Sequence, residues 1–381
     1  MNAVGPMPPW PLAAPGAHVV VALSGGVDSA VAAFRLLEQG YRVSALFMKN
    51  WEDDDTGGFC SAAADFASAR TVCDRLEIPL HAVNFARDYK ERVFARFLAD
   101  CRAGLTPNPD VLCNREIKFD VYWQHARSLG ATLMATGHYA RCTPLNADQA
   151  LLKTSRDADR DQTYFLHTID GAVLRRTLFP IGDLTKEEVR AIARRLGLHN
   201  ADRKSSTGIC FIGERHFKTF LRRYLTDAPG PIRSIDGALK GHHDGLMYYT
   251  IGQRHGLGIG GPGEPWYVAR KHLADRTLIV AQGRRHPALY RRGCLTAAPS
   301  WLTDPPAFPW RGLVKIRYRE KAHACTVEPA GEGLRITFTQ PAWAVAPGQS
   351  AVFYEGDTCL GGAVVTTADD ENPSGQTTRQ G

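Results

Sequence analysis

Short apolar runs alternate with helical spacing along the first half of the chain. The β-branched run at residues 17–23 predicts a strand, the spacing at 28–40 predicts a helix that ends on a glycine, and 41–48 predicts a second strand. The alternation continues with expected elements at 61–77, 79–84, 86–103, 114–129 and 131–136. Strands that alternate with helices pair in parallel through right-handed crossovers, so the pattern predicts an α/β fold with a doubly wound parallel sheet.

The second half of the chain has a different pattern of residue types. A capping box, Thr185 with Glu188, predicts one more helix at 185–197, and a basic helical segment follows at 214–225. From Pro229 on, glycine and proline are frequent and short alternating runs replace helical periods, which predicts an all-β half, a barrel or a sandwich. We expect five segments: a disordered leader (1–16), an α/β domain (17–225), a small central connector domain (226–287), a C-terminal all-β barrel (288–366) and a disordered tail (367–381).

Composition supports a packed, water-soluble protein. The 381 residues are 44% hydrophobic and 22% charged, which excludes wholesale disorder and a fibrous architecture. The first 18 residues read as neither a signal peptide nor a membrane anchor, and no run of eighteen apolar residues occurs. We therefore expect a cytoplasmic protein that has no membrane partner. Lysine and arginine (46) exceed aspartate and glutamate (39) by +7, which favours a polyanionic partner only if the excess is clustered.

Nine cysteines and thirteen histidines show no metal pattern. The cysteines are odd in number and include no CxxC pair, which argues against a disulfide scaffold and against a zinc site. Most of them are expected to be small buried hydrophobic residues in a reducing cytosol. The pair His242 and His243 is interpreted as surface loop residues, because no third ligand lies at a recognised spacing.

The sharpest local motif is SGGVDS, Ser24 to Ser29, between a predicted strand and a predicted helix. Its glycines allow a tight turn, its serines add hydroxyl donors, and the positive end of the helix dipole points at the same place, which together predict a phosphate cradle. No GK[ST] ending follows, so the loop is not a Walker motif. The alternative is a plain glycine turn. Asp28 could hold a magnesium ion against pyrophosphate, or merely satisfy helix N–H groups.

Three further segments carry candidate chemistry. Residues 106–119 place Asp110 and Cys113 at the mouth of a helix whose expected N-cap is Asn114, and the helix dipole with nearby basic residues would lower the pKa of the thiol. Residues 205–217 place Cys210 in a short apolar turn. Residues 135–141 place Gly137 and His138 at the carboxyl end of a strand, the edge where doubly wound folds bind ligands. Taken alone, either cysteine is better explained as a core residue than as a catalytic one.

SGGVDS resembles the PP-loop of the ATP pyrophosphatase superfamily, whose members cleave ATP between the α- and β-phosphates. Over residues 18 to 365 the chain resembles the tRNA-specific 2-thiouridylase family, the MnmA type. The segments that carry the resemblance are LSGGVDS, FMKNWEDDD, AAADFASARTVCDRL, TPNPDVLCNREIKF, ATGHYAR, DQTYFL, STGICFIGER, GLMYYTIGQRHGLGIGG, PWYV, IRYR and PGQSAVFY.

The resemblance implies a cytoplasmic tRNA sulfurtransferase that uses ATP and Mg²⁺. It would adenylate the wobble uridine of the anticodon and transfer persulfide sulfur to its 2-position, giving 2-thiouridine, AMP and pyrophosphate. Cys210 would carry the persulfide, Cys113 would release the sulfur, and a transient Cys113–Cys210 disulfide would result. Residues expected to hold ATP are Ala22, Leu23, Ser24, Gly25, Gly26, Val27, Asp28, Ser29, Met48 and Gly137.

The resemblance also implies RNA contacts. Asn108, Pro109 and Asp110 would contact the target base, which must be unstacked, and Asp110 could shuttle a proton. The remaining expected tRNA contacts are His138, Arg160, Asp161, Gln162, Arg317, Tyr318 and Gln349. Residues 284–323 hold nine basic and two acidic residues, a local excess of +7, in the part expected to bind RNA. Expected partners are tRNAs for lysine, glutamate and glutamine and a protein persulfide donor, and the chain is expected to be a monomer.

The chain departs from the family pattern at two positions. Ser205 stands where the family commonly has an acidic residue, and Arg160 stands where lysine is usual. Two other functions remain open at this point: a PP-loop ligase or amidotransferase that uses ammonia, and an RNA-binding module with a vestigial nucleotide loop. Iron–sulfur chemistry is disfavoured, because no CxxC pair exists to hold a cluster.

Overall fold

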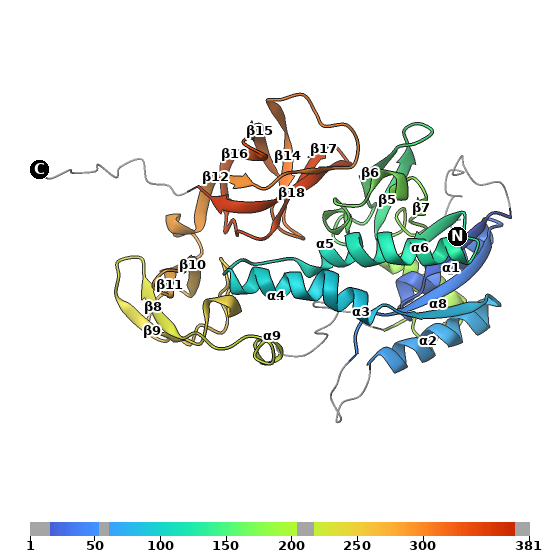
Figure 1. Cartoon of the computed structure of the whole chain (residues 1–381), viewed down its shortest axis with the longest axis horizontal. Coiled ribbons are helices and arrows are strands. Elements are labelled where there is room, and N and C mark those ends of the chain that lie inside the picture. The colour runs from blue at the N-terminus through green and yellow to red at the C-terminus, as the bar shows by residue number, and fades with distance from the viewer. Residues whose placement is uncertain (1–15, 53–60, 204–216, 370–381) are drawn as a thin grey trace, which may run out of the picture.

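The computed structural model describes residues 16–52, 61–203 and 217–369. A five-stranded sheet lies at the right in Figure 1, in the order β3-β2-β1-β4-β7. Each neighbouring pair is parallel, so the predicted doubly wound parallel sheet is confirmed. Its strands are β1 (His18–Ala22), β2 (Arg42–Lys49), β3 (Leu80–Asn84), β4 (Leu133–Thr136) and β7 (Thr177–Leu178).

Strand β1 separates two apolar cores. Val19 and Val21 pack in one core, whereas Val20 packs in the opposite one. All three side chains are 0% exposed, as expected for a central strand that is covered on both faces. The first core is closed by three helices: α1 (Val27–Glu38), α2 (Ser61–Leu76) and α8 (Lys186–Arg195). The predicted capping box of α8, Thr185 with Glu188, is confirmed.

The opposite core is covered by two helices that each contain a π-helical stretch. The first comprises α3 (Ala86–Tyr89), the π-helical η1 (Lys90–Phe94) and α4 (Ala95–Arg102). The second comprises α5 (Pro109–Cys113), the π-helical η2 (Asn114–Val121) and α6 (Tyr122–Ser128). Because α5 begins at Pro109 with Asn108 as its N-cap, the expected helix start at Asn114 is wrong. Proline is favoured at the first helical position, where its missing N–H would have no partner anyway.

A β-hairpin that the sequence pattern did not reveal projects from the α/β domain. It consists of β5 (Ala140–Pro144) and β6 (Ala150–Thr154), and β6 pairs with β18 (Thr358–Ala368) of the barrel. The α/β domain therefore contributes two strands to the sheet of the barrel. The remaining short elements before residue 222 are η3 (Thr163–Phe165), α7 (Gly171–Leu174) and α9 (Phe217–Leu221). The basic helix expected at 214–225 is thus described only from Phe217 and ends at Leu221.

The central part is a small four-stranded sheet in the order β10-β11-β8-β9. Its elements are β8 (Gly230–Ser234), β9 (Leu239–His243), the 3₁₀ turn η4 (Leu246–Tyr248), β10 (Trp266–His272) and β11 (Thr277–Gln282). His243 is buried at the end of β9, and its Nε2 lies 2.8 Å from the carbonyl oxygen of Arg276. The interpretation of His243 as a surface loop residue is therefore wrong, whereas His242 is exposed.

The C-terminal part is a closed antiparallel barrel, because β12 pairs with both β16 and β18. Its elements are η5 (Pro287–Leu289), β12 (Tyr290–Thr296), β13 (Ser300–Trp301), β14 (Trp310–Lys315), β15 (His323–Ala330), β16 (Gly333–Trp343), β17 (Ser350–Glu355) and β18. The expected tail from residue 367 starts too early, since β18 continues to Ala368 and the Asp369 N–H donates to Gly293 O. Within the described ranges, no helix is long and apolar enough to cross a membrane.

Candidate active site

The SGGVDS motif forms a tight loop between β1 and α1. Gly25 has a φ of +76°, and a Cβ there would lie 2.4 Å from the carbonyl oxygen of Asp65, so only glycine fits. Ser29 Oγ donates to the Gly26 carbonyl oxygen at 3.1 Å and accepts from the Ser24 N–H at 3.2 Å. Ser24 itself is exposed. The loop is thus fixed from within, and the Ser24 hydroxyl also lies 3.3 Å from the Ser29 hydroxyl.

The base of the loop is tied to the rest of the domain through the Gly25 carbonyl oxygen. This oxygen accepts hydrogen bonds from Ser68 Oγ at 2.7 Å and from Asn200 Nδ2 at 2.9 Å. Because a trans peptide unit points its N–H opposite to its C=O, the Gly26 N–H is directed away from these partners. Gly26 is also the N-cap of α1 and provides no side-chain cap, so the first N–H groups of α1 are available to an anion.

The loop lies at the point where the strand order of the sheet reverses. From β1 the order runs to β2 and β3 on one side and to β4 on the other, and such switch points form the ligand crevice of open α/β sheets. On one side, Met48 lies near the carboxyl end of β2, just beyond the partner of Ala22. On the other side, Gly137 directly follows β4. A Cβ on Gly137 would lie 2.7 Å from the Ser29 backbone nitrogen, so glycine permits β4 to approach α1. The structure thus brings the predicted ATP-binding residues to one edge.

Asp28 faces a buried lysine. Both of its carboxylate oxygens accept hydrogen bonds from Lys186 Nζ, at 2.6 and 2.8 Å, and Oδ1 also accepts from the Tyr139 hydroxyl at 2.9 Å. The Lys186 side chain is 2% exposed and that of Asp28 is 28% exposed. Burial, together with the Asp28 carboxylate, raises the pKa of Tyr139, which keeps its hydroxyl a donor. The carboxylate is therefore engaged by a cation of the protein, and its surroundings do not fit a magnesium ligand.

Cys113 lies inside the second helix rather than at its N-terminus. Cys113 is 2% exposed and packs in the apolar core, one turn after Asp110. Asn108 Oδ1 accepts from the Asp110 N–H at 3.2 Å, which caps the helix. The next residue, Asn114, donates from Nδ2 to the Phe165 carbonyl oxygen at 3.1 Å, so it anchors the helix to η3 instead of capping it. The expected lowering of the Cys113 pKa by a helix N-terminus at Asn114 therefore loses its structural basis.

The segment that leads into this helix is held by both C-terminal parts of the chain. Lys271 Nζ of β10 donates to the Gly104 carbonyl oxygen at 3.0 Å. From the barrel side, Gln349 Nε2 donates to the Thr106 carbonyl oxygen at 2.7 Å, and the Thr106 N–H donates to Pro347 O at 2.8 Å. Burial lowers the pKa of Lys271 to about 8. Figure 1 shows α4 running toward β10 and β11, where this segment begins.

The other candidate cysteine, Cys210, lies outside the described residues, as do Ser205 and Cys60. The geometry of a Cys113–Cys210 disulfide therefore stays a prediction. Burial raises the pKa to about 12 for the thiols of the six remaining cysteines, Cys73, Cys101, Cys142, Cys294, Cys325 and Cys359. Thiols that stay protonated are poor nucleophiles, which agrees with their interpretation as packing residues.

His138 connects the edge of the sheet with the helix that carries Cys113. Its ring centroid lies 6.1 Å from that of Phe119 in η2, and its Nδ1 lies 2.8 Å from Thr136 Oγ1. Desolvation, reinforced by the Lys118 ammonium, lowers the pKa of His138 well below its ordinary value. The imidazole is therefore neutral near pH 7, and can contact RNA by hydrogen bonds but not as a cation.

Two of the expected tRNA contacts near residue 160 have internal partners. Asp161 is 5% exposed, and its carboxylate lies 3.1 Å from Lys315 Nζ and accepts from Thr163 Oγ1 at 2.8 Å. Gln162 Oε1 accepts from the Tyr139 N–H at 2.8 Å. These side chains join the α/β domain to the barrel and to Tyr139. Arg160 is partly buried. Asp161 therefore positions this segment through buried contacts, and its expected contact with tRNA stays a prediction.

The expected tRNA contacts in the barrel, Arg317 and Tyr318, also have partners inside the protein. Arg317 Nη2 donates to the Ala344 carbonyl oxygen at 2.8 Å and to that of Ile251, and burial lowers the pKa of its guanidinium. The Tyr318 ring packs against Phe165 at a tilt, with ring centroids 4.4 Å apart. Pro109, expected to contact the target base, is likewise buried. These side chains support the site from inside the protein.

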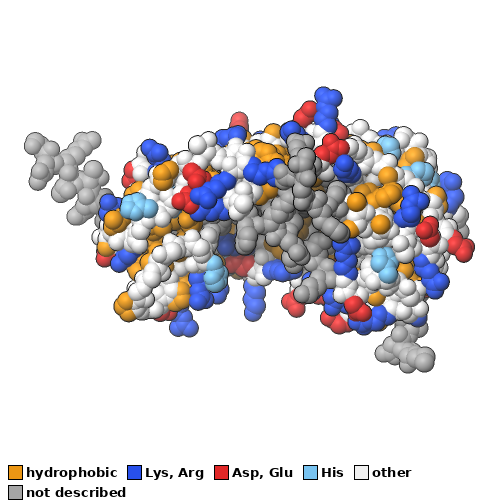
Figure 2. All heavy atoms as spheres, turned by 90° about the horizontal axis from the view of Figure 1, so that it is seen from below, with side chains coloured by type: hydrophobic (Ala, Val, Ile, Leu, Met, Phe, Trp, Pro, Cys, Tyr) orange, Lys and Arg blue, Asp and Glu red, His pale blue; other side chains and the backbone are white. Residues whose placement is uncertain are grey.

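The basic stretch at 284–323 contains both buried and exposed cations. Arg291 is 5% exposed and donates to two backbone carbonyl oxygens, those of Ala288 and Tyr290. The exposed cations of the stretch are Arg284, Arg285, Arg292, Arg311, Arg319 and Lys321. Figure 2 shows basic side chains along most of the length of the face it presents, with acidic ones between them. The local excess of +7 counted in the sequence thus overstates the charge offered to RNA.

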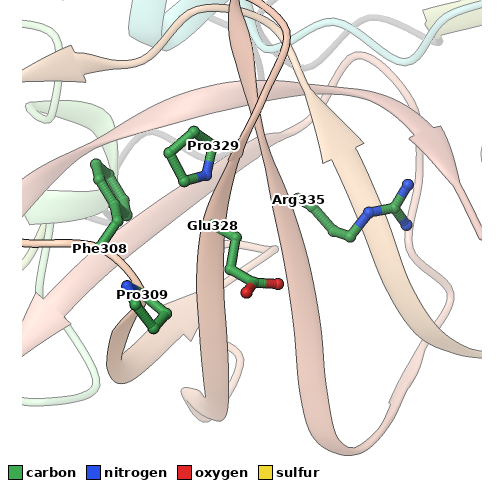
Figure 3. A pocket seen from close by; sticks show the side chains of 5 residues that line it. All are labelled: Phe308, Pro309, Glu328, Pro329 and Arg335. Atoms are coloured by element: carbon green, nitrogen blue, oxygen red, sulfur yellow. The ribbon is translucent and has the colours of Figure 1, made fainter.

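An open hollow of about 520 Å³ lies on the barrel, and none of the predicted site residues lines it. Its lining residues are Phe308, Pro309, Glu328, Pro329 and Arg335 (Figure 3). The Arg335 guanidinium lies 3.3 Å from the Asp369 carboxylate, which neutralises it. Among the described residues, no group of three or more histidines, cysteines or acidic residues could hold a metal ion.

Sequence reasoning missed Lys186, Tyr139 and Lys271. Each occupies a place that only the tertiary fold reveals, since Lys186 lies 158 positions from Asp28 and Lys271 lies 167 positions from Gly104. A weak signal existed for Lys186: it directly follows the N-cap of α8, whose remaining residues are strongly amphipathic. A lysine in the first turn of a helix opposes the helix dipole, which hints at a purpose other than helix stability.

Three family models cover the chain. Residues 17–214 match the "tRNA methyl transferase HUP domain", 218–282 the "tRNA methyl transferase PRC-barrel domain" and 291–365 the "Aminomethyltransferase beta-barrel domain". The tRNA-specific 2-thiouridylase MnmA of Legionella pneumophila is 51% identical over 355 residues, covering 92% of this chain and 98% of that protein. The enzyme of the same name from Methylococcus capsulatus is 54% identical over 356 residues, covering 91% and 96%.

Among solved structures, a 4-thiouridine synthetase in complex with RNA and ATP is similar to 54% of this chain, over 49% of its own length, with 17% identity and a TM-score of 0.34. The two curated relatives match almost end to end at more than half identity. The chain therefore belongs to the tRNA-specific 2-thiouridylase family.

Proposed function

We propose that this protein is an ATP-dependent tRNA sulfurtransferase that converts the wobble uridine of the anticodon to 2-thiouridine. The observation that carries the proposal is the position of the Ser24–Ser29 loop at the switch point of a sheet, one face of which is covered by the helix that bears Asp110 and Cys113. His138 links the two, because it follows Gly137 and packs against Phe119 of that helix. The near end-to-end match to 2-thiouridylases supports the same chemistry.

The phosphate loop performs the first role in this reaction. Its N–H groups and the N-terminus of α1 hold the triphosphate of ATP while the uridine 2-oxygen attacks the α-phosphorus. Pyrophosphate leaves, and the adenylated oxygen becomes a good leaving group. Residues 22–29, Met48 and Gly137 form this part of the site. Magnesium would enter together with the nucleotide.

The two cysteines perform the second role. The terminal sulfur of a Cys210 persulfide attacks carbon 2 of the activated uridine, and AMP departs. The Cys113 thiolate then attacks the inner sulfur, that of Cys210, which releases 2-thiouridine and leaves a Cys113–Cys210 disulfide. A reductant restores both thiols. Asp110, in the first turn of α5, would orient the base or shuttle its proton.

The segment at 106–110 would receive the unstacked base, and the exposed cations of the barrel would contact tRNA phosphates. We place domain boundaries near residues 225 and 287, which separates a catalytic α/β domain, a connector and an RNA-binding barrel. Further parts of the proposal are wobble-uridine tRNAs for lysine, glutamate and glutamine as substrates, a protein persulfide donor, a monomeric state and a cytoplasmic location.

The test is reconstitution. The protein is incubated with ATP, a persulfide source and unmodified tRNA, and AMP and 2-thiouridine are quantified together. Wild type should form both in equal amounts, whereas Cys210→Ala should form no 2-thiouridine. Thiolation by Cys210→Ala at the wild-type rate would refute the assignment. Incorporation of ammonia by a variant lacking both cysteines would support the ligase alternative instead.

A further inference from the structure

Lys186 is a buried cation that contacts Asp28 of the phosphate loop, and neither the sequence motifs nor the proposed reaction gives it a task. It is the first residue of α8, its side chain is 2% exposed, and its Nζ lies within 2.8 Å of both Asp28 oxygens. Tyr139 completes the arrangement with a hydrogen bond to the same carboxylate. Lysine is almost never fully buried unless it is paired.

The pair is poorly explained as a stability device. Desolvating two charges is unfavourable, and well-packed apolar residues stabilise a core at least as well as a buried ion pair does. The position of Asp28 offers a better explanation, because it is the second residue of α1 and belongs to the loop that would hold phosphates. An uncompensated carboxylate there would repel a triphosphate. Lys186 neutralises it without reaching solvent.

The same geometry leaves no place for a metal on Asp28. Magnesium requires nearly octahedral oxygen ligands at about 2.0–2.1 Å. Around Asp28, an ammonium already bridges the two oxygens, and a hydroxyl points its hydrogen at one of them. A divalent ion bound to this carboxylate would have to displace Lys186 from a buried position or share the carboxylate with it against charge repulsion.

We propose that Lys186, and not magnesium, is the cation bound to Asp28, and that Lys186 and Tyr139 fix this carboxylate so that the loop presents a neutral pair to ATP. Lys186 is thus a positioning residue for the nucleotide site. Magnesium arrives on the phosphate oxygens of the nucleotide and takes no ligand from Asp28. This inference rests on the ATP site of the proposed function.

The first experiment measures ATP affinity by isothermal titration calorimetry, without tRNA or sulfur donor and at constant excess Mg²⁺. Lys186→Met should weaken ATP binding by about tenfold or more, because the Asp28 carboxylate would lose its cation and repel the phosphates. The double variant Asp28→Asn/Lys186→Met should recover most of that loss. Equal weakening in the single and double variants would overturn the proposal.

The second experiment follows the metal itself. Free Mn²⁺ is monitored by electron paramagnetic resonance while it is titrated into the protein with ATP, for wild type and Asp28→Asn. The proposal expects the same Mn²⁺ half-saturation in both. A rise of about tenfold in Asp28→Asn, with metal-free ATP affinity unchanged, would identify Asp28 as a metal ligand and overturn it. This arm decides the matter even if Lys186→Met does not fold.

Lys153→Met is the control, since Lys153 also pairs with an aspartate, Asp357, but where β6 meets the barrel. It should leave ATP affinity unchanged. The outcomes separate the two proposals: a wild-type protein that binds no ATP refutes the proposed function, whereas an effect of Asp28 on the metal refutes only the role of Lys186.

Discussion

Gln349 donates a hydrogen bond from Nε2 to the carbonyl oxygen of Thr106 at 2.7 Å, across 243 positions of sequence. The bond ties the barrel to the segment that enters the Cys113 helix. Gly348 reinforces it, because a Cβ there would lie 2.7 Å from the Thr106 backbone nitrogen. If RNA binds the barrel as proposed, this bond connects the bound RNA to the segment that enters the Cys113 helix.

Gln349→Ala should reduce the rate of thiolation more than it reduces tRNA affinity. Losing a hydrogen bond of this kind costs about 1 kcal/mol, which corresponds to roughly a fivefold change if it is expressed fully in the rate. Single-turnover thiolation and tRNA binding by filter retention measure the two effects. Gln340→Ala, at an exposed position of β16, serves as control. A loss confined to tRNA affinity would show that Gln349 acts on RNA instead.

Gly137→Ala should weaken ATP binding while leaving the fold intact. The added methyl would lie 2.7 Å from the Ser29 nitrogen and 2.8 Å from the Asp28 carbonyl carbon, so the start of α1 must shift. We expect a loss of about tenfold in ATP affinity, measured by calorimetry. Gly260→Ala is the control, since nothing lies within 4 Å of its Cβ position. Unchanged affinity in Gly137→Ala would show that α1 adapts without affecting the site.

Lys315→Met should destabilise the protein by about 3–5 kcal/mol, because it leaves the Asp161 carboxylate, 3% exposed, without its cation. Asp161→Asn/Lys315→Met should be less destabilised than the single variant. Differential scanning calorimetry gives the comparison. Arg87→Ala removes an exposed pair with Glu91, 88% and 62% exposed, and should change little. Similar shifts for both pairs would contradict the structural role of Asp161.

Lys271 should make stability depend on pH above 8. Burial lowers its pKa from 10.5 to about 8 in the folded protein, so between these values the unfolded chain binds more protons. Folding stability then rises with pH across that window, because the unfavourable burial of the charge is relieved. The melting temperature of wild type relative to Lys271→Met should increase from pH 7.5 to pH 10. Lys321→Met, at an exposed lysine, should show no such trend.

Local patterns in the sequence predicted what depends on neighbouring residues. The glycine turn at Gly25 and the capping box of Thr185 with Glu188 are such features, and both have the expected geometry. The alternation of strands and helices predicted the parallel sheet for the same reason. The helix start was misplaced because the sequence pattern placed the N-cap at Asn114, whereas Asn108 is the N-cap and Pro109 occupies the first helical position.

Contacts between distant segments could not be predicted in this way. The Lys186–Asp28 pair joins positions 158 residues apart and has no local pattern. Asp161 was predicted only as a tRNA contact implied by the family resemblance, and no local pattern revealed its ion pair with Lys315 of the barrel. The β5–β6 hairpin was missed because each strand is short and only partly apolar, and its partner β18 lies two hundred residues away.

The pairing of β6 with β18 has a consequence for any attempt to study the parts separately. Thr358 and Cys359 of β18 are opposite Lys153 and Leu152 of the α/β domain. A fragment that ended before the barrel would leave β6 with an open edge, and an isolated barrel would expose the start of β18. Unpaired strand edges recruit other strands, so proteolytic separation of the two should yield fragments that self-associate rather than two independently soluble domains.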